Sequence, residues 1–163
     1  MPATSPKILI AEDSFVNQKI LLRILKQIGC NADVVSNGLQ AIEAVTSKNY
    51  DIVFMDMYMP EMDGLEATRK IVQSRFPGNR PRIIALTADS VFGDKEKCIE
   101  AGMDDYTTKP VRVEEILSML NRWAPVPVMS VATIISQMIK PQVDTLRKQH
   151  VPNAVPVFRV CRN

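Results

Sequence analysis

Short apolar runs alternate with longer amphipathic segments between residues 7 and 123. The runs KILIA, ADVVS, DIVFM and RIIALT, and the weaker run DYTT, predict strands at residues 7–11, 32–36, 51–55, 82–87 and 105–108. Most of these runs are apolar on both faces, which is typical of strands in a parallel sheet that is covered on both sides.

Helical spacing of apolar residues marks the segments between the strands. One face is formed by Ile20, Leu21, Ile24, Leu25 and Ile28, another by Leu65, Thr68, Ile71 and Val72, and a third by Val113, Ile116, Leu117 and Leu120. The pair Asn37-Gly38 indicates a turn that opens a further helix. The segment 90–102 is the least apolar helix, and we expect it to pack most loosely. Strand and helix alternate five times, which predicts an α/β fold with helices on both faces of the sheet.

Composition adds limits to this picture. The 163 residues are 46% hydrophobic and 23% charged, which indicates a globular domain with a real core and excludes a disordered chain. No run approaches the roughly 18 apolar residues of a membrane span, and MPATSPK lacks the features of a signal peptide. Cys30, Cys98 and Cys161 form no C-x-x-C pair, so we expect reduced thiols and no zinc site. These features predict a soluble cytoplasmic protein.

The charge changes sign along the chain. Residues 1–123 carry a net charge of −2, whereas residues 124–163 carry +4 and hold five of the eleven prolines. This predicts an N-terminal segment at 1–6, a domain at 7–123 and a Pro-rich basic extension at 124–163. The extension has helix-like apolar spacing interrupted by Pro141, and packing on the domain, homodimer formation and disorder stay open. It is too short for a helix-turn-helix module, which argues against nucleic-acid binding. We assign no phosphodonor role to its His150, the only histidine.

Polar residues follow the ends of four predicted strands. Glu12 and Asp13 follow the first, Asp56 ends the third, Thr87 ends the fourth and Lys109 follows the fifth. Ligand sites in open parallel sheets lie beyond the carboxyl ends of the strands, so these residues are expected to share one shallow pocket.

Three neighbouring carboxylates repel one another unless a positive charge lies among them. Mg²⁺ resolves this most simply, because it prefers carboxylate oxygens and usually works beside a phosphate. A carboxylate can also attack phosphorus to form an aspartyl phosphate, a reaction that needs positioning and charge neutralisation. We therefore predict that Asp56 is a phosphoacceptor assisted by Mg²⁺ and Lys109.

Each of these residues has an ordinary explanation when it is taken alone. Asp56 could form a turn or cap a helix, and Glu12 could favour a helix dipole. Thr87 could be a strand threonine and Lys109 a solvated charge. The occurrence of all of them at strand ends is what favours a shared site.

A family resemblance rests on the same motifs. ILIAEDSFVNQ, DIVFMDMYMPEMDG, IIALTA and AGMDDYTTKP, in this order and spacing, resemble the receiver domain of two-component response regulators, the CheY-like family. The resemblance covers about residues 7–123. It implies a flavodoxin-like, doubly wound, five-stranded parallel sheet with the strand order 2-1-3-4-5.

The resemblance also implies roles around the acids. Asp56 would take a phosphoryl group from a phosphohistidine, and Asp13 would bind Mg²⁺ directly, with Glu12 assisting through water. The backbone carbonyl of Tyr58 would complete the protein ligands.

Further roles concern the response to phosphorylation. Lys109 would pair with the phosphoryl oxygens, the hydroxyl of Thr87 would move to meet them, and Tyr106 would then turn inward as the switch aromatic. The bond between Lys109 and Pro110 is expected to be cis, which would aim the lysine at the site. Gly64 is expected to serve the turn backbone.

Two positions bear on the lifetime of the phosphorylated state. Tyr58 and Asp89 lie two residues after Asp56 and Thr87, respectively, beside the expected path of water. The bulk of Tyr58 is therefore predicted to slow hydrolysis.

The segments EDSFVNQKI and MDMYMPEMDGLEATRKI are most similar to the corresponding segments of receivers in hybrid histidine kinases. A histidine kinase or a histidine phosphotransfer protein is then the expected partner. The chain would be a free regulator or the cytosolic part of a larger membrane-bound kinase.

Two alternatives are a phosphorylation-independent pseudo-receiver and a flavin-binding flavodoxin-like module. The acids in AEDSFVNQ would repel a flavin phosphate, which argues against the flavin-binding module. The sequence shows no separate substrate site, which argues against a turnover enzyme.

Overall fold

The computed structural model describes residues 5–74, 79–88 and 93–124. All of them belong to the first of the two units into which the chain divides, Met1–Met129. The predicted extension at 124–163 lies outside the described residues except for Ala124, as do Asp89 and His150.

Strands and helices alternate through the described residues, as the hydrophobic pattern predicts. The elements are β1 (Ile8–Ala11), α1 (Phe15–Gln27), β2 (Ala32–Val35), α2 (Gly38–Ser47), β3 (Ile52–Asp56), α3 (Gly64–Gln73), β4 (Arg82–Thr87), α4 (Asp94–Ala101), β5 (Asp105–Thr108) and α5 (Val113–Trp123).

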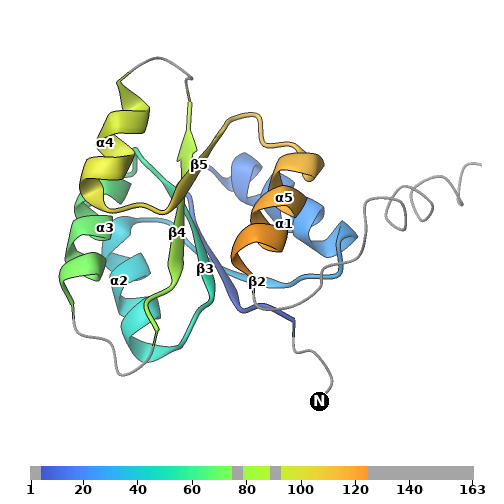
Figure 1. The fold of residues 1–163 in the computed structure, drawn as a ribbon, viewed down its shortest axis with the longest axis horizontal. Coiled ribbons are helices and arrows are strands. Elements are labelled where there is room, and N and C mark those ends of the chain that lie inside the picture. The colour runs from blue at the N-terminus through green and yellow to red at the C-terminus, as the bar shows by residue number, and fades with distance from the viewer. Residues whose placement is uncertain (1–4, 75–78, 89–92, 125–163) are drawn as a thin grey trace, which may run out of the picture. The chain divides into compact units, whose positions relative to one another are not determined.

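One parallel sheet runs in the order β2-β1-β3-β4-β5, which confirms the predicted fold class and strand order. Helices α2, α3 and α4 cover one face of this sheet, and α1 and α5 cover the other (Figure 1). The double cover explains why β1, β3 and β4 are apolar throughout. All residues of β1 and β3 are buried, and β4 exposes only Arg82.

Side-chain caps fix where three helices begin. Ser14 accepts from the N–H of Asn17, Asn37 accepts from Gln40, and Asp63 accepts from Glu66; these side chains open α1, α2 and α3. A side-chain oxygen at this position satisfies a helix N–H that has no partner within the helix. The predicted turn at Asn37 is thereby confirmed as the start of α2.

Two members of the predicted apolar helix faces are exposed. Ile20 and Val72 remain 42% and 40% exposed, although other members of their predicted faces, such as Leu21 and Ile71, are buried. Helical spacing defines the centre of an apolar stripe, but the width that is covered depends on the neighbouring elements. Ile20 and Val72 lie at the uncovered margins.

Helix α4 (Asp94–Ala101) lies within the predicted segment 90–102, of which residues 90–92 lie outside the described residues. It buries only Cys98 and Ala101, which agrees with the expected loose packing. Cys98 and Cys30 are buried and free, and burial raises the pKa of the Cys98 thiol to about 11, so it stays protonated at neutral pH.

No helix among residues 5–74, 79–88 and 93–124 is long and apolar enough to cross a membrane.

Gly64, the first residue of α3, packs directly against the main chain of Asp56. A Cβ atom built there would lie 2.9 Å from the Asp56 carbonyl carbon and would overlap its oxygen. We therefore predict that Gly64→Ala lowers the free energy of unfolding by about 2–4 kcal/mol, measured by urea denaturation, because main-chain atoms cannot easily move aside.

Gly93→Ala is the matched control, because a Cβ atom there meets nothing within 4 Å. Its cost is expected to stay below about 1 kcal/mol, the order of the small preference for glycine over alanine at an N-cap. Equal destabilisation by the two substitutions would contradict the close approach at Gly64.

Candidate functional site

The polar residues predicted at the strand ends lie at one edge of the sheet. Glu12 and Asp13 follow β1, Asp56 is the last residue of β3, Thr87 is the last residue of β4, and Lys109 follows β5. Because all five strands are parallel, their carboxyl ends meet at this edge. The fold thus gathers residues that are far apart in the sequence.

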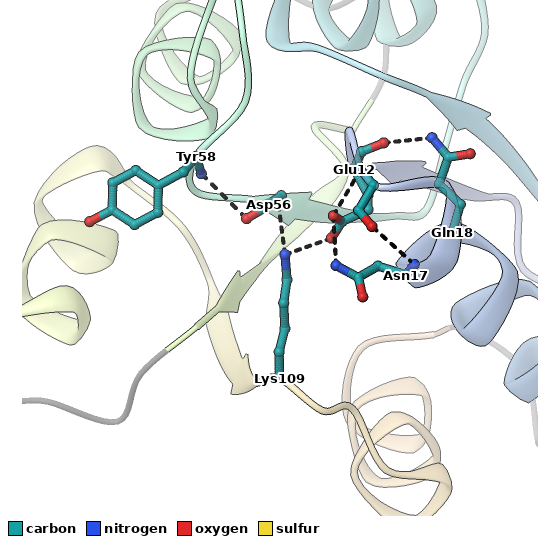
Figure 2. A network of polar contacts seen from close by, with 7 residues as sticks. Glu12, Asn17, Gln18, Asp56, Tyr58 and Lys109 are labelled. Carbon is teal, nitrogen blue, oxygen red and sulfur yellow. Dashed lines mark hydrogen bonds and ion pairs between the residues drawn. The ribbon is translucent and has the colours of Figure 1, made fainter.

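Lys109 joins two of the acids. Its Nζ lies 2.6 Å from Oδ2 of Asp56 and 2.7 Å from Oε2 of Glu12 (Figure 2). Its main-chain N–H donates to the carbonyl of Thr87 at 2.7 Å, which fixes the lysine beside the end of β4. The bond between Lys109 and Pro110 is cis, as expected.

The lysine remains charged in this position. Burial lowers the pKa of Lys109, but the hydrogen bonds to Asp56 and Glu12 outweigh burial, and the net pKa is raised. Its side chain is only 20% exposed, so water screens these ion pairs less than it would at an open surface.

The contact with Lys109 does not fully compensate the burial of Asp56 and the nearby charge of Glu12. Burial raises the pKa of the Asp56 carboxyl, and the negative charge of Glu12 raises it further. The Lys109 hydrogen bond and the Tyr58 N–H, which donates to Asp56 Oδ1 at 3.3 Å, lower it without cancelling the rise. A further cation beside Asp56 would therefore stabilise its charged form.

Glu12 is oriented by contacts that were not predicted. Its Oε1 accepts from the side-chain amide of Asn17 at 3.0 Å and from the N–H of Ser14 at 3.2 Å. The amide of Gln18 donates to the Glu12 carbonyl at 2.7 Å (Figure 2). The sequence contained an indication of these contacts, because Asn17 and Gln18 follow the acid pair closely. Which groups their amides bind depends on the angle at which α1 leaves β1.

A candidate metal centre is formed by Glu12, Asp13 and Asp56. One carboxylate oxygen from each lies within 4.8 Å of the others. With the Lys109 ammonium, the four ionised groups carry a net charge of −2, which one divalent cation would neutralise. A set of carboxylate oxygens with one exposed member, Asp13, fits Mg²⁺, which prefers such ligands and keeps several waters. Asp13 is exposed and free to turn toward an ion, whereas both oxygens of Glu12 already contact protein groups.

The remaining predicted residues surround this centre. Thr87 is buried, and Tyr106 on β5 is 38% exposed with the Lys95 ammonium 5.5 Å from its ring centroid. Tyr58 is 56% exposed, and its hydroxyl lies 3.4 Å from Oδ1 of Asp94 at the start of α4. The outward position of Tyr106 is thus observed, and its inward turn stays a prediction.

A small cavity of about 40 Å³ adjoins Lys109 on the α1 side. Its lining combines the polar edge of the site with apolar groups: Glu12, Asn17, Ile20, Leu21, Leu86, Lys109, Pro110 and Val111. Ile20, a member of the predicted apolar face of α1, therefore borders the site.

Comparison with known proteins supports one family. Residues 8–121 match the response regulator receiver domain family. Hybrid signal transduction histidine kinase B of Dictyostelium discoideum is 44% identical over 121 residues, which cover 68% of this chain and 6% of that protein. Two-component response regulator 24 of Arabidopsis thaliana is 38% identical over 115 residues, covering 70% of this chain and 81% of that protein. The chain thus spans only a small part of the hybrid kinase.

Solved structures agree. The receiver domain of sensor histidine kinase PA1611 from Pseudomonas aeruginosa, with a magnesium ion in its active-site cleft, has a TM-score of 0.67 and 39% identity, covering 74% of this chain and 98% of that one. A co-crystal of the Saccharomyces cerevisiae phosphotransfer protein Ypd1 with the Ssk1 receiver domain gives a TM-score of 0.67 and 29% identity, covering 76% and 91%. It follows that the chain belongs to the response regulator receiver domain family of two-component and phosphorelay signal transduction.

Proposed function

We propose that Asp56 accepts a phosphoryl group from a phosphohistidine. The observation that carries this proposal is the Lys109 ammonium, 2.6 Å from Asp56 Oδ2 at the edge of a three-acid cluster. A carboxylate nucleophile placed here has a cation ready for the incoming phosphoryl oxygens. The presence of the acceptor, the acids and the lysine argues against a pseudo-receiver.

The transfer needs only one exchange of bonds. An oxygen of Asp56 forms a bond to phosphorus while the phosphorus–nitrogen bond breaks, and its electron pair returns to the donor imidazole. Lys109 then shifts its contact from the carboxylates to the phosphoryl oxygens. The domain assists its own modification and turns over no separate substrate.

Mg²⁺ is the proposed cofactor, held directly by Asp13, Asp56 and the Tyr58 carbonyl. Glu12 assists through water, because its Oε1 accepts from Asn17 and its Oε2 meets Lys109. Bound Mg²⁺ would neutralise charge on the phosphoryl oxygens. The magnesium in the PA1611 receiver supports this assignment.

The proposed output is a shift between two states of the domain. The Thr87 hydroxyl moves toward the phosphoryl group, and Tyr106 turns into the space that this movement opens. The exposed position of Tyr106 and the burial of Thr87 at the neighbouring strand end fit the starting state.

The proposed donor or recipient is a histidine kinase or a histidine phosphotransfer protein. The Ypd1 complex with a receiver of the same fold supports this partner class. The identity to hybrid kinases supports the interpretation of residues 7–123 as one receiver domain of a cytoplasmic relay. Homodimer formation and the role of 124–163 stay predictions.

Phosphorylation of Asp56 can be measured directly. Incubation with acetyl phosphate and Mg²⁺ is expected to add one acid-labile phosphoryl group by intact mass, because the acid cluster and Lys109 activate this carboxylate. Asp56→Asn, or chelation of Mg²⁺, should abolish the addition. If the wild type shows neither a mass increase nor a response to beryllofluoride, that result would instead support a pseudo-receiver.

Mg²⁺ should also stabilise the fold, because it neutralises the repelling carboxylates. At 100 times its Kd the gain is about 2.7 kcal/mol, measurable by urea denaturation. Asp13→Asn should lose most of this gain while being at least as stable as the wild type without metal, since one repelling charge is gone. Glu43→Gln, an exposed change on α2, should keep the full gain. An Asp13→Asn protein with an undiminished gain would rule out Asp13 as a ligand.

The Tyr58 ring is predicted to hinder water at the phosphoryl group. Tyr58→Asn should shorten the half-life of the phosphorylated protein severalfold, because a smaller side chain excludes less water. Tyr58→Phe keeps the ring and should retain most of the slow hydrolysis. The half-lives follow from the decay of the phosphorylated mass after removal of the donor. Unchanged decay in Tyr58→Asn would show that the ring does not shield the site.

A further inference from the structure

The two residues that follow Asp56 both contact helix α4. The thiol of Cys98 lies 3.6 Å from Sδ of Met57, and the hydroxyl of Tyr58 donates to Oδ1 of Asp94 at 3.4 Å. Asp94 and Cys98 are four residues apart in α4, so they lie on the same side of the helix. Figure 2 shows the Tyr58 ring extending away from Glu12 and Lys109.

The second half of the same loop is attached to other elements. The N–H of Gly38 donates to the Met62 carbonyl at 3.0 Å, and the side-chain amide of Asn37 donates to Glu61 Oε2 at 3.1 Å. Asp63 caps α3 through the N–H of Glu66. In the described part of the chain, polar contacts fix the loop to α2 and α3 at its far end, and the two residues beside the acceptor contact α4.

Helix α4 has fewer buried residues than each of the other described helices. It buries two residues, and its N-cap Gly93 provides no side-chain cap. Among the described residues, Lys97 of α4 also interacts with Tyr58, Cys98 packs in the hydrophobic core, and the Lys95 ammonium lies over the Tyr106 ring. A helix that buries so little of its surface responds to small changes in its contacts.

We propose that Asp94 is a positioning residue, and that it couples α4 to the phosphorylation site directly through Tyr58. The main-chain N–H of Tyr58 donates to Asp56, and its side-chain hydroxyl donates to Asp94, so one residue touches both groups. Any change at the Asp56 oxygens moves the Tyr58 backbone and is passed to the first turn of α4. This route is separate from Thr87 and Tyr106. It rests on the proposed role of Asp56, because that role supplies the change.

Coupling of this kind is reciprocal, which allows it to be tested from the α4 side. In the full chain without metal, Asp94→Ala should speed hydrogen exchange of the Tyr58 amide roughly two- to fivefold, as expected for loss of one modest hydrogen bond. Tyr58→Phe should speed exchange in α4 by a similar factor. The double variant should show no larger effect than either single one, because both remove the same contact.

Two further variants separate the contact from general effects on the helix. Asp94→Asn keeps an acceptor oxygen for Tyr58 while losing the ion pair with Lys97, so it should restore near wild-type exchange. Glu96→Ala removes a second acid from the first turn, and Glu96 has no ion pair or side-chain hydrogen bond within residues 5–74, 79–88 and 93–124. Its Tyr58 amide should exchange as in the wild type.

The second readout is the affinity for beryllofluoride with Mg²⁺, measured by calorimetry. Asp94→Ala should weaken it by the same factor as the change in exchange, and Glu96→Ala should not. An Asp94→Ala effect confined to α4, with normal Tyr58 exchange and normal affinity, would overturn the coupling. If the wild type binds no beryllofluoride but the exchange effects appear, the phosphoacceptor proposal fails and the contact between Tyr58 and Asp94 stands.

Discussion

The ion pairs of Lys109 with Asp56 and Glu12 are the interaction on which the site depends. Glu12 is completely buried and Asp56 nearly so, and two such carboxylates close together are costly without a cation. The ammonium offsets this cost but leaves the pKa of Asp56 raised, because burial and Glu12 outweigh it. The pocket is therefore stable enough to form and still short of positive charge. That remaining deficit is what makes a divalent cation and a phosphoryl group favourable additions.

Only the parallel sheet can create this arrangement, because its members come from segments distant in the sequence. The register pairs Asp56 with Leu86 and Thr87 with Thr108, so Lys109 emerges one residue beyond β5, beside the acceptor. The bond from the Lys109 N–H to the Thr87 carbonyl continues this ladder past the strand ends. The fully buried strands β1 and β3 give the acids a rigid support, which is what precise placement of charges requires.

Sequence reasoning recovers the parts of this molecule that rest on strong periodicity. The five strands and the acids at their ends follow from apolar runs that stop at a charged residue, and a family resemblance supplies the strand order. Sequence reasoning fails where the position of a side chain depends on the angle between two elements. Ile20 has the spacing of a core residue yet borders the site, and the bond from Asn17 to Glu12 depends on how α1 leaves β1. The contact between Tyr58 and Asp94 joins two polar residues with no periodic signal, so no pattern indicates it.

The loop after Asp56 illustrates how a rigid site can still transmit a signal. Gly64 lets the loop return so closely that its N–H donates to the Met57 carbonyl at 3.0 Å, and a main-chain hydrogen bond from Gly38 of α2 secures Met62. A loop held so firmly at its far end cannot absorb a displacement there. Movement at Asp56 must then appear at Met57 and Tyr58, whose side chains contact the least buried helix of the sheet's α2–α4 face. Because the far end of the loop is firmly attached to α2 and α3, a change at Asp56 is transmitted to α4. Packed elements shift between discrete arrangements and do not deform continuously.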